Sequence, residues 1–286
     1  MLSWPVEPTP SVAAFGRKLD HWLALARGRA DLCLLPEYAA VELGAALAGR
    51  SVASEAEEVA AMVAAAPGIL AEMRAAACRA GLWVQAGTLP MLEDGRVVNV
   101  APLIAPDGRM AIQRKCMMTR FELESWGVAS GGAPQVFDTH FGRIGIAICY
   151  DVEFPKHVRM QAEAGAWLIL TPSCTDTRAG AARVRIGAQA RALENQFYVA
   201  VAHTVGVAPH SAALDANHGQ AALYGPPDRG FPEDGVVAAG PADVPGWLFA
   251  LADPALVARV RAEGAVRNHQ DFPRAPMPPC RPASFA

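Results

Sequence analysis

The chain has 286 residues and a formal net charge of −3, from 25 Lys and Arg residues against 28 Asp and Glu residues. Hydrophobic residues make up 52% and charged residues 19%, which excludes a disordered chain. The balanced charge argues against a nucleic-acid-binding protein that depends on bulk positive charge, and no apolar run reaches the roughly 18 residues of a membrane span.

The first elements lead to an acidic residue. The opening segment LSWPV predicts an edge strand at best, because Pro5 cannot donate a ladder hydrogen bond. Apolar residues at steps of three and four predict an amphipathic helix over 12–26. The apolar run 31–35 is stopped by Pro36 and predicts a buried strand, so we expect Glu37 just after that strand's C-terminal end.

An alanine-rich helical stretch follows. Ser54 and Glu57 form a capping-box pattern at its start. Pro67 and Gly68 predict that the stretch divides into two helices, of which the second ends near Arg79.

The middle of the chain predicts strands. A short strand is expected over 82–86, and a β-hairpin over 96–104 and 110–114 around the turn residues 106–108. Lys115 then stands at the end of the second hairpin strand.

The next apolar run ends at a cysteine. The run 143–148 predicts a buried strand with Cys149 at its end, and Pro155 suits the first turn of a helix that ends near Glu163. The remaining segments predict a strand over 167–170, a helix over 181–195, a strand over 197–202, hairpins and loops over 204–246, a short strand over 248–251 and a helix over 254–263.

Strands and helices interleave, which predicts an α/β class, or α+β by some definitions, with helices covering the sheets. Without an internal repeat or a clear linker, we expect one domain over residues 1–272. Five prolines in the last 15 residues predict an extended, Pro-rich tail over 273–286.

The cysteines and the N-terminus indicate the compartment. The opening residues MLSWPVEPTP have neither the basic start nor the apolar stretch of a secretory signal. The six cysteines, at positions 33, 78, 116, 149, 174 and 280, contain no CxxC pair. We therefore predict a reduced, cytoplasmic setting.

Three strand ends each carry one reactive residue: Glu37, Lys115 and Cys149. The segments around them are LLPEY, RKCMMTRFE and GIAICYDVEFP, and LTPSCTDT and RVRIGAQARALENQFYVAVAHTVG follow later. In order and spacing they resemble the blocks of the nitrilase superfamily, which are carbon–nitrogen hydrolases with a Glu-Lys-Cys triad. The resemblance covers about residues 11 to 272.

The resemblance implies an α-β-β-α sandwich of two packed mixed sheets flanked by helices, commonly paired into a homodimer or a higher homo-oligomer. It implies no metal and no cofactor. True nitrilases tend to carry Trp-Glu after the cysteine, whereas this chain has Tyr150-Asp151, which is similar to the amidase-like branch.

Elementary chemistry gives each of the three residues a task. A free thiol is only a few per cent thiolate at pH 7, so Cys149 needs a base. Glu37 would take the thiol proton and return it to the leaving nitrogen, which calls for a raised carboxylate pKa. Lys115 suits the oxyanion of the tetrahedral intermediate, and the backbone N–H of Tyr150 is a candidate second donor.

Other residues complete the candidate site. Similar enzymes carry a second Glu after the lysine, for which Glu122 is favoured over Glu124. Cys116 and Cys174 are rival thiols, and Cys174 is the better candidate for lining the substrate pocket. Buried filler is the alternative for both.

Two clusters have ordinary explanations. The spacing of His203, His210 and His218 with Asp215 fits no tight metal-ligand pattern, so we expect no metal. The helical spacing of Arg183, Arg185 and Arg191 favours a solvated or subunit-facing surface over an anion site.

Glu153 is a departure from amidase-like relatives, many of which carry Arg at this position of a CYDxRFP segment. A Glu153 side chain that faces the pocket would disfavour carboxylate-bearing substrates, since like charges in a partly desolvated site repel. The alternative is a structural pair between Glu153 and a buried Arg.

The favoured hypothesis is a hydrolase that cleaves a small linear amide through a cysteine thioester and releases ammonia or an amine. Within the enzyme class, hydrolysis of an N-carbamoyl amine or of a nitrile is the alternative. A metabolite-binding protein or a thiol redox sensor is the alternative from another class. The intact set of Glu37, Lys115 and Cys149 argues against the binding protein, and the lack of a CxxC pair argues against the sensor.

Overall fold

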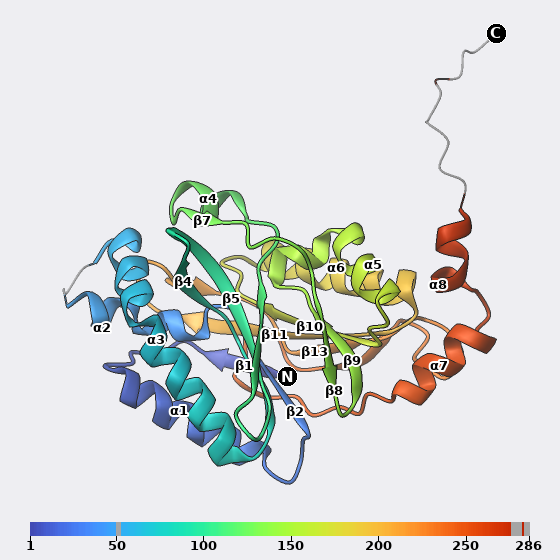
Figure 1. The fold of residues 1–286 in the computed structure, drawn as a ribbon, viewed down its shortest axis with the longest axis horizontal. Helices are drawn as coiled ribbons and strands as arrows, with labels where there is room; N and C mark the ends of the chain where they lie inside the picture. Colours follow the sequence, from blue (N-terminus) through green and yellow to red (C-terminus); the bar gives the residue numbers. More distant parts are fainter. Residues whose placement is uncertain (50–52, 276–281, 283–286) are drawn as a thin grey trace.

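The computed structural model describes residues 1–49, 53–275 and 282. These form two mixed β-sheets that pack face to face, with a layer of helices on each outer side (Figure 1). The predicted α-β-β-α sandwich is thereby confirmed.

The first sheet has the strand order β14-β13-β11-β10-β9-β8, with β1, β12 and β15 attached to one side. Its centre is parallel, because β10 runs parallel to both β9 and β11. Its strands are β1 (Leu2–Pro5), β8 (Val136–Thr139), β9 (Gly142–Ile146), β10 (Leu168–Ser173), β11 (Tyr198–Val207), β12 (Ala216–Asn217), β13 (Ala222–Tyr224), β14 (Val236–Ala239) and β15 (Gly246–Trp247).

The second sheet has the order β2-β3-β5-β4, with β6 and β7 also paired to β5. The pairing of β5 with β6 is the predicted hairpin, in which Val100 faces Arg114 and Ile104 faces Met110. Its strands are β2 (Leu32–Leu35), β3 (Trp83–Ala86), β4 (Leu89–Glu93), β5 (Arg96–Ile104), β6 (Met110–Arg114) and β7 (Val128–Ala129).

The helices are α1 (Val12–Ala26), α2 (Gly44–Ala48), α3 (Glu55–Ala80), α4 (Arg120–Glu124), α5 (Pro155–Glu163), α6 (Arg178–Asn195), α7 (Pro254–Glu263) and α8 (Asn268–Asp271), with 3-10 turns at Ala39–Leu43, Cys149–Glu153 and Phe272–Arg274. Helices α1 and α3 pack on each other, and α3 covers the second sheet. Helices α5 and α6 cover the first sheet. Strands β10 and β11 face β2 across the interior of the sandwich.

Three expectations for single elements are wrong. Pro67 and Gly68 do not divide α3, which runs unbroken from its Ser54–Glu57 capping box to Ala80. Both residues are exposed, while Met62 and Ile69 on either side stay anchored in the core and keep the helix continuous past the one hydrogen bond that Pro67 cannot donate. The expected strand over 248–251 lies instead at Gly246–Trp247.

The third correction concerns β1, which is an interior strand and not an edge. It pairs parallel with β11 and antiparallel with β15. Pro5 is tolerated because it is the last residue of the strand, beyond the two residues, Leu2 and Ser3, that pair with β15.

By length and composition alone, α3 could cross a membrane. One such helix is weak evidence, because a helix that packs on a protein core passes the same test. Here Met62, Ile69 and Met73 of α3 are buried in the core under the second sheet. Most of the predicted Pro-rich tail lies outside the described residues.

Candidate active site

Strand ends from both sheets bring the three reactive residues together. Glu37 follows β2, Lys115 follows β6, and Cys149 begins the 3-10 turn after β9. All three side chains are buried. Gly87, at φ +75°, is needed beside them, because a Cβ at that position would clash with the Pro36 carbonyl.

Both oxygens of the Glu37 carboxylate accept hydrogen bonds. Oε1 accepts one from Lys115 Nζ at 2.8 Å and one from Asn99 Nδ2 at 3.0 Å. Oε2 accepts one from the backbone N–H of Cys174 at 3.2 Å. The side chain is therefore held from β5, β6 and β10 at once.

Lys115 lies between two carboxylates. Its Nζ is 2.8 Å from Glu37 Oε1 and 2.6 and 2.7 Å from the two oxygens of Glu122. Glu122 also accepts a bond of 2.7 Å from the Tyr38 hydroxyl and closes a capping box with Thr119 at the start of α4. The arrangement leaves Lys115 charged and fixed in place.

Cys149 is the first residue of a sharp turn. Its φ of +45° is unusual for a residue with a side chain and marks local strain. The thiol donates to the Cys174 carbonyl at 3.6 Å, and it lies close enough to Glu37 for the carboxylate to influence it electrostatically. A thiol, a carboxylate and an ammonium group therefore share one buried volume.

Burial and charge set the protonation states. Burial raises the pKa of Glu37 to about 7, although the Lys115 ammonium opposes the shift. Burial also acts on Glu122 and Lys115, but their mutual attraction prevails: the pKa of Glu122 is lowered and the pKa of Lys115 is raised well above its ordinary value. Burial and the neighbouring Glu37 raise the pKa of Cys149. The thiol is therefore neutral at rest, and a base is needed before it can act as a nucleophile.

Asp151 connects two of the site loops. Its carboxylate accepts backbone N–H bonds from Met117 at 2.8 Å, Ile148 at 3.1 Å and Cys116 at 3.2 Å. The loop after Lys115 is thereby fixed to the turn that carries Cys149. Sequence reasoning assigned no role to Asp151 or to Asn99, although Asp151 lies in the segment quoted for the cysteine.

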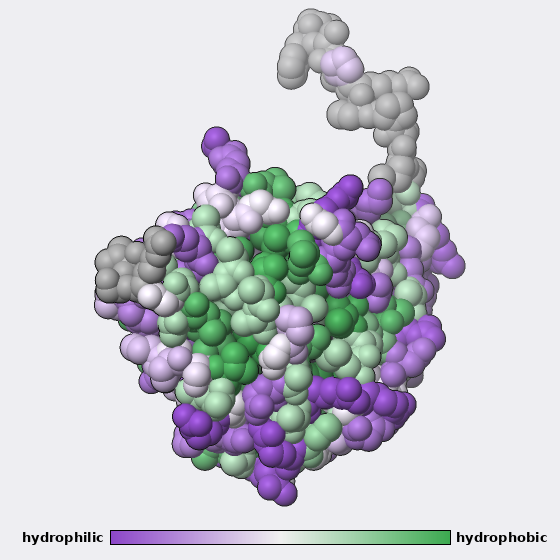
Figure 2. Space-filling view, turned by 60° about the vertical axis from the view of Figure 1, so that its left-hand side comes forward, coloured by the Kyte–Doolittle hydropathy of each residue, from purple (hydrophilic) through white to green (hydrophobic). Residues whose placement is uncertain are grey.

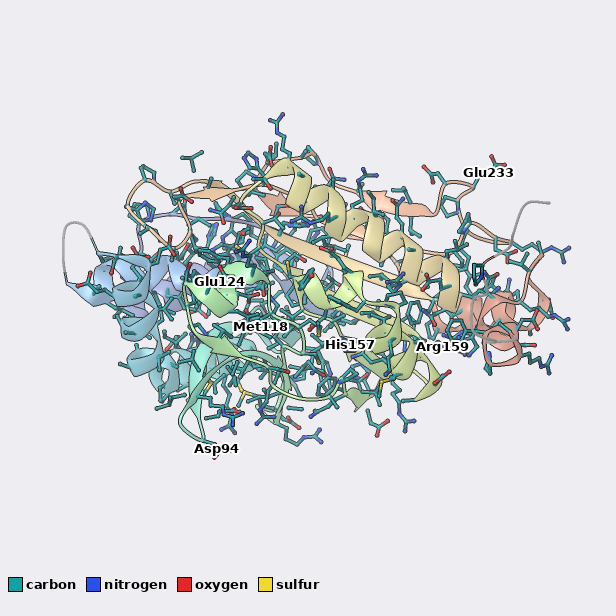
Figure 3. The ribbon with its side chains drawn as sticks, turned by 90° about the horizontal axis from the view of Figure 1, so that it is seen from above. Asp94, Met118, Glu124, His157, Arg159 and Glu233 are labelled. Atoms are coloured by element: carbon teal, nitrogen blue, oxygen red, sulfur yellow. The ribbon has the colours of Figure 1, made fainter. Side chains whose placement is uncertain are left out.

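The structure separates the two candidates for the second carboxylate. Glu122 touches Lys115, whereas Glu124 is exposed on the outside of α4 and pairs with Arg120 at 2.7 Å (Figure 3). Cys174 contributes its backbone N–H to Glu37 and its carbonyl to Cys149. Glu124 is thus not brought to the site, while Cys174 is.

The remaining candidates lie close to Cys149 in the chain. Tyr150 follows it, and its half-buried ring packs on Phe154. Glu153 ends the same turn and faces Arg183 of α6 at 3.7 Å. This Arg is exposed, so Glu153 is neither an unpaired charge nor the partner of a buried Arg.

Of the three arginines expected on a solvated surface, Arg191 is an exception. It is buried, donates to the Val152 carbonyl at 3.2 Å and pairs with Glu194. It braces α6 against the turn after Cys149. The spacing of arginines along a helix could not distinguish this one, because burial depends on the neighbouring element.

Cys116 is buried beside Asp151 and His157, and the three ligand atoms lie within 4.8 Å of one another. The Asp151 oxygens already accept backbone N–H bonds, so this group is explained as part of the loop connection. Elsewhere among the described residues, His218 pairs with Asp243 at 3.2 Å.

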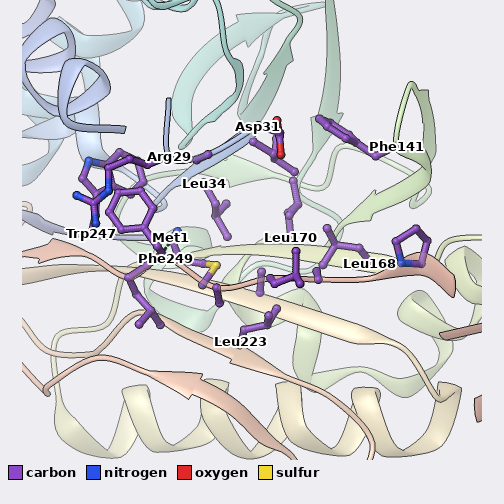
Figure 4. A pocket seen from close by; sticks show the side chains of 18 of the residues that line it. Met1, Arg29, Asp31, Leu34, Phe141, Leu168, Leu170, Leu223, Trp247 and Phe249 are labelled. Atoms are coloured by element: carbon purple, nitrogen blue, oxygen red, sulfur yellow. Dashed lines mark hydrogen bonds between the residues drawn. The ribbon is translucent and has the colours of Figure 1, made fainter. Parts of the chain in front are cut away.

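A cavity of about 580 Å³ lies away from the reactive residues (Figure 4). It opens between the sheets near the N-terminal ends of β2 and β10, where Leu34, Leu170, Trp247 and Phe249 line it. Glu37 and Cys149 follow the opposite ends of their strands.

Figure 2 shows one face of the molecule, on the side where Figure 1 shows α2, α3 and α4. Apolar residues gather in the centre of this face.

Comparison with known proteins agrees with this geometry. A family model described as carbon-nitrogen hydrolase matches residues 9–261. The chain is 30% identical over 272 residues to a probable hydrolase, YhcX, of Bacillus subtilis, which covers 95% of this chain and 52% of that protein. It is also 30% identical over 131 residues to omega-amidase NIT2-A of Xenopus laevis, covering 43% of this chain and 47% of that protein. The chain thus spans about half the length of these curated relatives.

Two solved structures show the same fold. Nit3 of Saccharomyces cerevisiae, a member of branch 10 of the nitrilase superfamily, superposes with a TM-score of 0.71 at 20% identity, over 91% of this chain and 92% of that one. An amidase from Nesterenkonia sp. AN1, in complex with butyramide, superposes with a TM-score of 0.66 at 22% identity, over 91% of both chains.

Proposed function

Since this chain belongs to the carbon–nitrogen hydrolase family, we propose that it cleaves the C–N bond of a small linear amide through a thioester on Cys149. The observation that carries the proposal is the buried contact of Lys115 with Glu37, 2.8 Å apart, with the buried Cys149 thiol under the electrostatic influence of the same carboxylate. A variant of the Nesterenkonia amidase supports a reactive cysteine, because the acetamide moiety of fluoroacetamide adds covalently to the active-site cysteine of that protein.

In the first half of the reaction, the Cys149 sulfur bonds to the carbonyl carbon as its proton passes to Glu37. The tetrahedral oxyanion is stabilised by the Lys115 ammonium and by the backbone N–H of Tyr150, and one such donor is worth about 3 kcal/mol in the transition state. Glu37 then returns the proton to the nitrogen, the C–N bond breaks, and ammonia or an amine leaves.

In the second half, water attacks the thioester. Glu37 takes a proton from the water, the C–S bond breaks, and the proton returns to the sulfur as the carboxylic acid is released. Glu122 keeps Lys115 in place through both halves, with bonds of 2.6 and 2.7 Å.

Small molecules are the substrates that this family implies. The positive charge of Arg183 partly compensates the negative charge of Glu153. Glu153 is therefore less able to repel a substrate that carries a carboxylate. Hydrolysis of an N-carbamoyl amine or a nitrile would use the same three residues, and it is distinguished from amide hydrolysis by which substrates release ammonia.

The test is ammonia release by the purified protein from a panel of linear amides, N-carbamoyl amines and nitriles. We expect release from linear amides, complete loss in Cys149→Ala, and unchanged release in Cys78→Ala, which removes an exposed thiol. Intact mass should show an acyl adduct on Cys149 during turnover. Full activity in Cys149→Ala would refute the thioester intermediate. Ammonia release from nitriles or N-carbamoyl amines alone would refute linear amides as the substrate class.

A further inference from the structure

Asn99 contacts two of the reactive residues from a strand that carries none of them. It lies on β5 and is fully buried. Its Nδ2 donates to Glu37 Oε1 at 3.0 Å, and its backbone carbonyl accepts from the backbone N–H of Lys115 at 2.9 Å. One residue therefore fixes the carboxylate and the position of the lysine.

The two oxygens of Glu37 are bonded differently. Oε1 accepts from Lys115 Nζ and from Asn99 Nδ2, which together use both of its lone pairs. Oε2 accepts from the Cys174 backbone N–H at 3.2 Å and keeps one lone pair for a further proton. The two oxygens are consequently not equivalent as bases.

The oxygen of the Asn99 amide, Oδ1, is consistent with an amide orientation that directs Nδ2 at Glu37. This oxygen is buried and has no hydrogen-bond partner among the described residues. Turning the amide around would direct Oδ1 at the Glu37 carboxylate, where two oxygens would repel. The side chain thus keeps its donor on Glu37 and leaves its own acceptor unpaired, and a buried unpaired acceptor of this kind calls for a functional reason.

We propose that Asn99 is a positioning residue that occupies Glu37 Oε1 and thereby makes Oε2 the oxygen that takes and returns the proton. As the bond from Cys149 sulfur to the substrate carbon forms, the thiol proton moves to Oε2. As the C–N bond breaks, that proton moves from Oε2 to the leaving nitrogen. The inference rests on the proposed role of Glu37 as the base for Cys149.

Asn99→Leu tests the proposal, because it keeps the size of the side chain and removes the donor. A hydrogen bond to an ionised group favours the ionised form, so its loss should raise the pH at which Glu37 becomes a base by about one unit. We expect the rate of Cys149 alkylation by iodoacetamide, followed by peptide mass, to fall about tenfold at pH 6 and to approach that of the unchanged protein at pH 9.

This readout needs no amide substrate, so it separates the positioning role from the proposed function. A shifted alkylation profile in a protein that hydrolyses no amide would support the role of Asn99 and refute only the substrate. Where amides are hydrolysed, the acid limb of kcat/KM should move by the same amount. The exposed thiol of Cys78 should keep its alkylation profile in every variant.

Gln85→Leu is the matched control. Gln85 is a fully buried amide on β3 that donates to the Gly87 carbonyl and has no bond to Glu37. Removing the Gln85 amide should leave the pH dependence of Cys149 alkylation unchanged. An unmoved profile in folded Asn99→Leu, or an equal shift in Gln85→Leu, would overturn the proposal. Should Asn99→Leu fail to fold, the smaller Asn99→Ala also removes the donor and gives the same test.

Discussion

Lys115 contacts two buried carboxylates, Glu122 and Glu37, and stabilises the charged form of one more than that of the other. It contacts both oxygens of Glu122 but only one of Glu37. Glu122 also accepts from Tyr38 and Thr119, so its anion is better stabilised. Its pKa is lowered, while burial raises that of Glu37 to about 7. Two acids of the same chemistry thus suit different tasks in the proposed mechanism, one as a fixed charge and one as a proton carrier.

The pKa of Glu37 sets the expected pH dependence. Below about pH 7 this carboxyl is protonated and cannot accept the Cys149 proton. We therefore expect kcat/KM to rise with pH, to bend near pH 7, and to be about tenfold below its plateau one unit lower. Initial rates of ammonia release from pH 5 to 9 measure this. A rate that falls as pH rises from 5 to 7 would contradict the role of Glu37 as base.

Glu122 and Glu124 form a matched pair of variants. Glu122→Gln keeps the capping box but removes one of the two anions beside Lys115, so we expect kcat to fall about 100-fold with little change in Tm. Glu124→Gln loses only an exposed pair with Arg120, worth less than about 1 kcal/mol, and should leave kcat unchanged. Steady-state kinetics of both variants, compared with the unchanged protein, measure the two effects on kcat. Equal effects of the two would argue against the placement of Glu122.

At the scale of elements, short turns do the positioning. The residues after β2, β6 and β9 come from segments far apart in the chain, and Asp151 binds two of these turns together with three backbone hydrogen bonds. Because a carboxylate that accepts several N–H bonds is favoured as an anion, it holds both loops while it stays charged. Burial raises the pKa of Asp151 to about 6 in opposition to these bonds.

Helix α3 allows a test of the unbroken helix. Gly68 lies on its exposed side, and a Cβ there would meet no atom within 4 Å. Gly68→Ala should therefore stabilise the protein by about 0.5–1 kcal/mol, because alanine favours the helix over glycine. Thermal unfolding should show a Tm rise of a few degrees. A lower Tm would indicate that the helix is interrupted at Pro67 and Gly68.

A contrasting glycine controls for the effect of the substitution itself. Gly44 begins α2, and a Cβ there would come within 2.9 Å of the Cβ of Glu58. Glu58 is buried and holds Ser211 at 2.7 Å, so it has little room to move. Gly44→Ala should lower the Tm under conditions in which Gly68→Ala raises it.

At the scale of the whole molecule, the reactive residues and the cavity of about 580 Å³ lie at opposite ends of the strands. The parallel strands β9 and β10 carry Cys149 and Cys174 just past their C-terminal ends, whereas the cavity lies near Leu168 at the beginning of β10. The gathering of Glu37, Lys115 and Cys149 at one end of the strands, and not the cavity at the other end, therefore identifies the candidate active site.

The outer face of α5 and α6 bears on assembly, and a homodimer remains our prediction. Ile186 and Leu193 are 59% and 41% exposed and lie two turns apart on α6, and Met160 is 46% exposed on the neighbouring α5. Burying them against a second copy would remove apolar surface from water. We expect the mass of a dimer in light scattering after size exclusion, and a shift to monomer in Ile186→Asp. A monomer at micromolar concentration would contradict this.

The sequence alone determined the features that depend on neighbours in the chain. The hydrophobic period of α1, the capping box of α3 and the hairpin of β5 and β6 are local, and so is the position of Glu37, Lys115 and Cys149 at strand ends. Short-range sterics and capping bonds decide them. The quoted segments also identified the family.

Tertiary structure decided what depends on partners distant in the chain. The continuity of α3 through Pro67 comes from packing on both sides of it, and the interior place of β1 comes from pairing with β11 and β15. The contact of Glu122 with Lys115, the burial of Arg191 and the contact of Asn99 with Glu37 likewise required the fold. Burial and hydrogen bonding are properties of the whole molecule, because a side chain's surroundings come from elements that the adjacent residues do not specify.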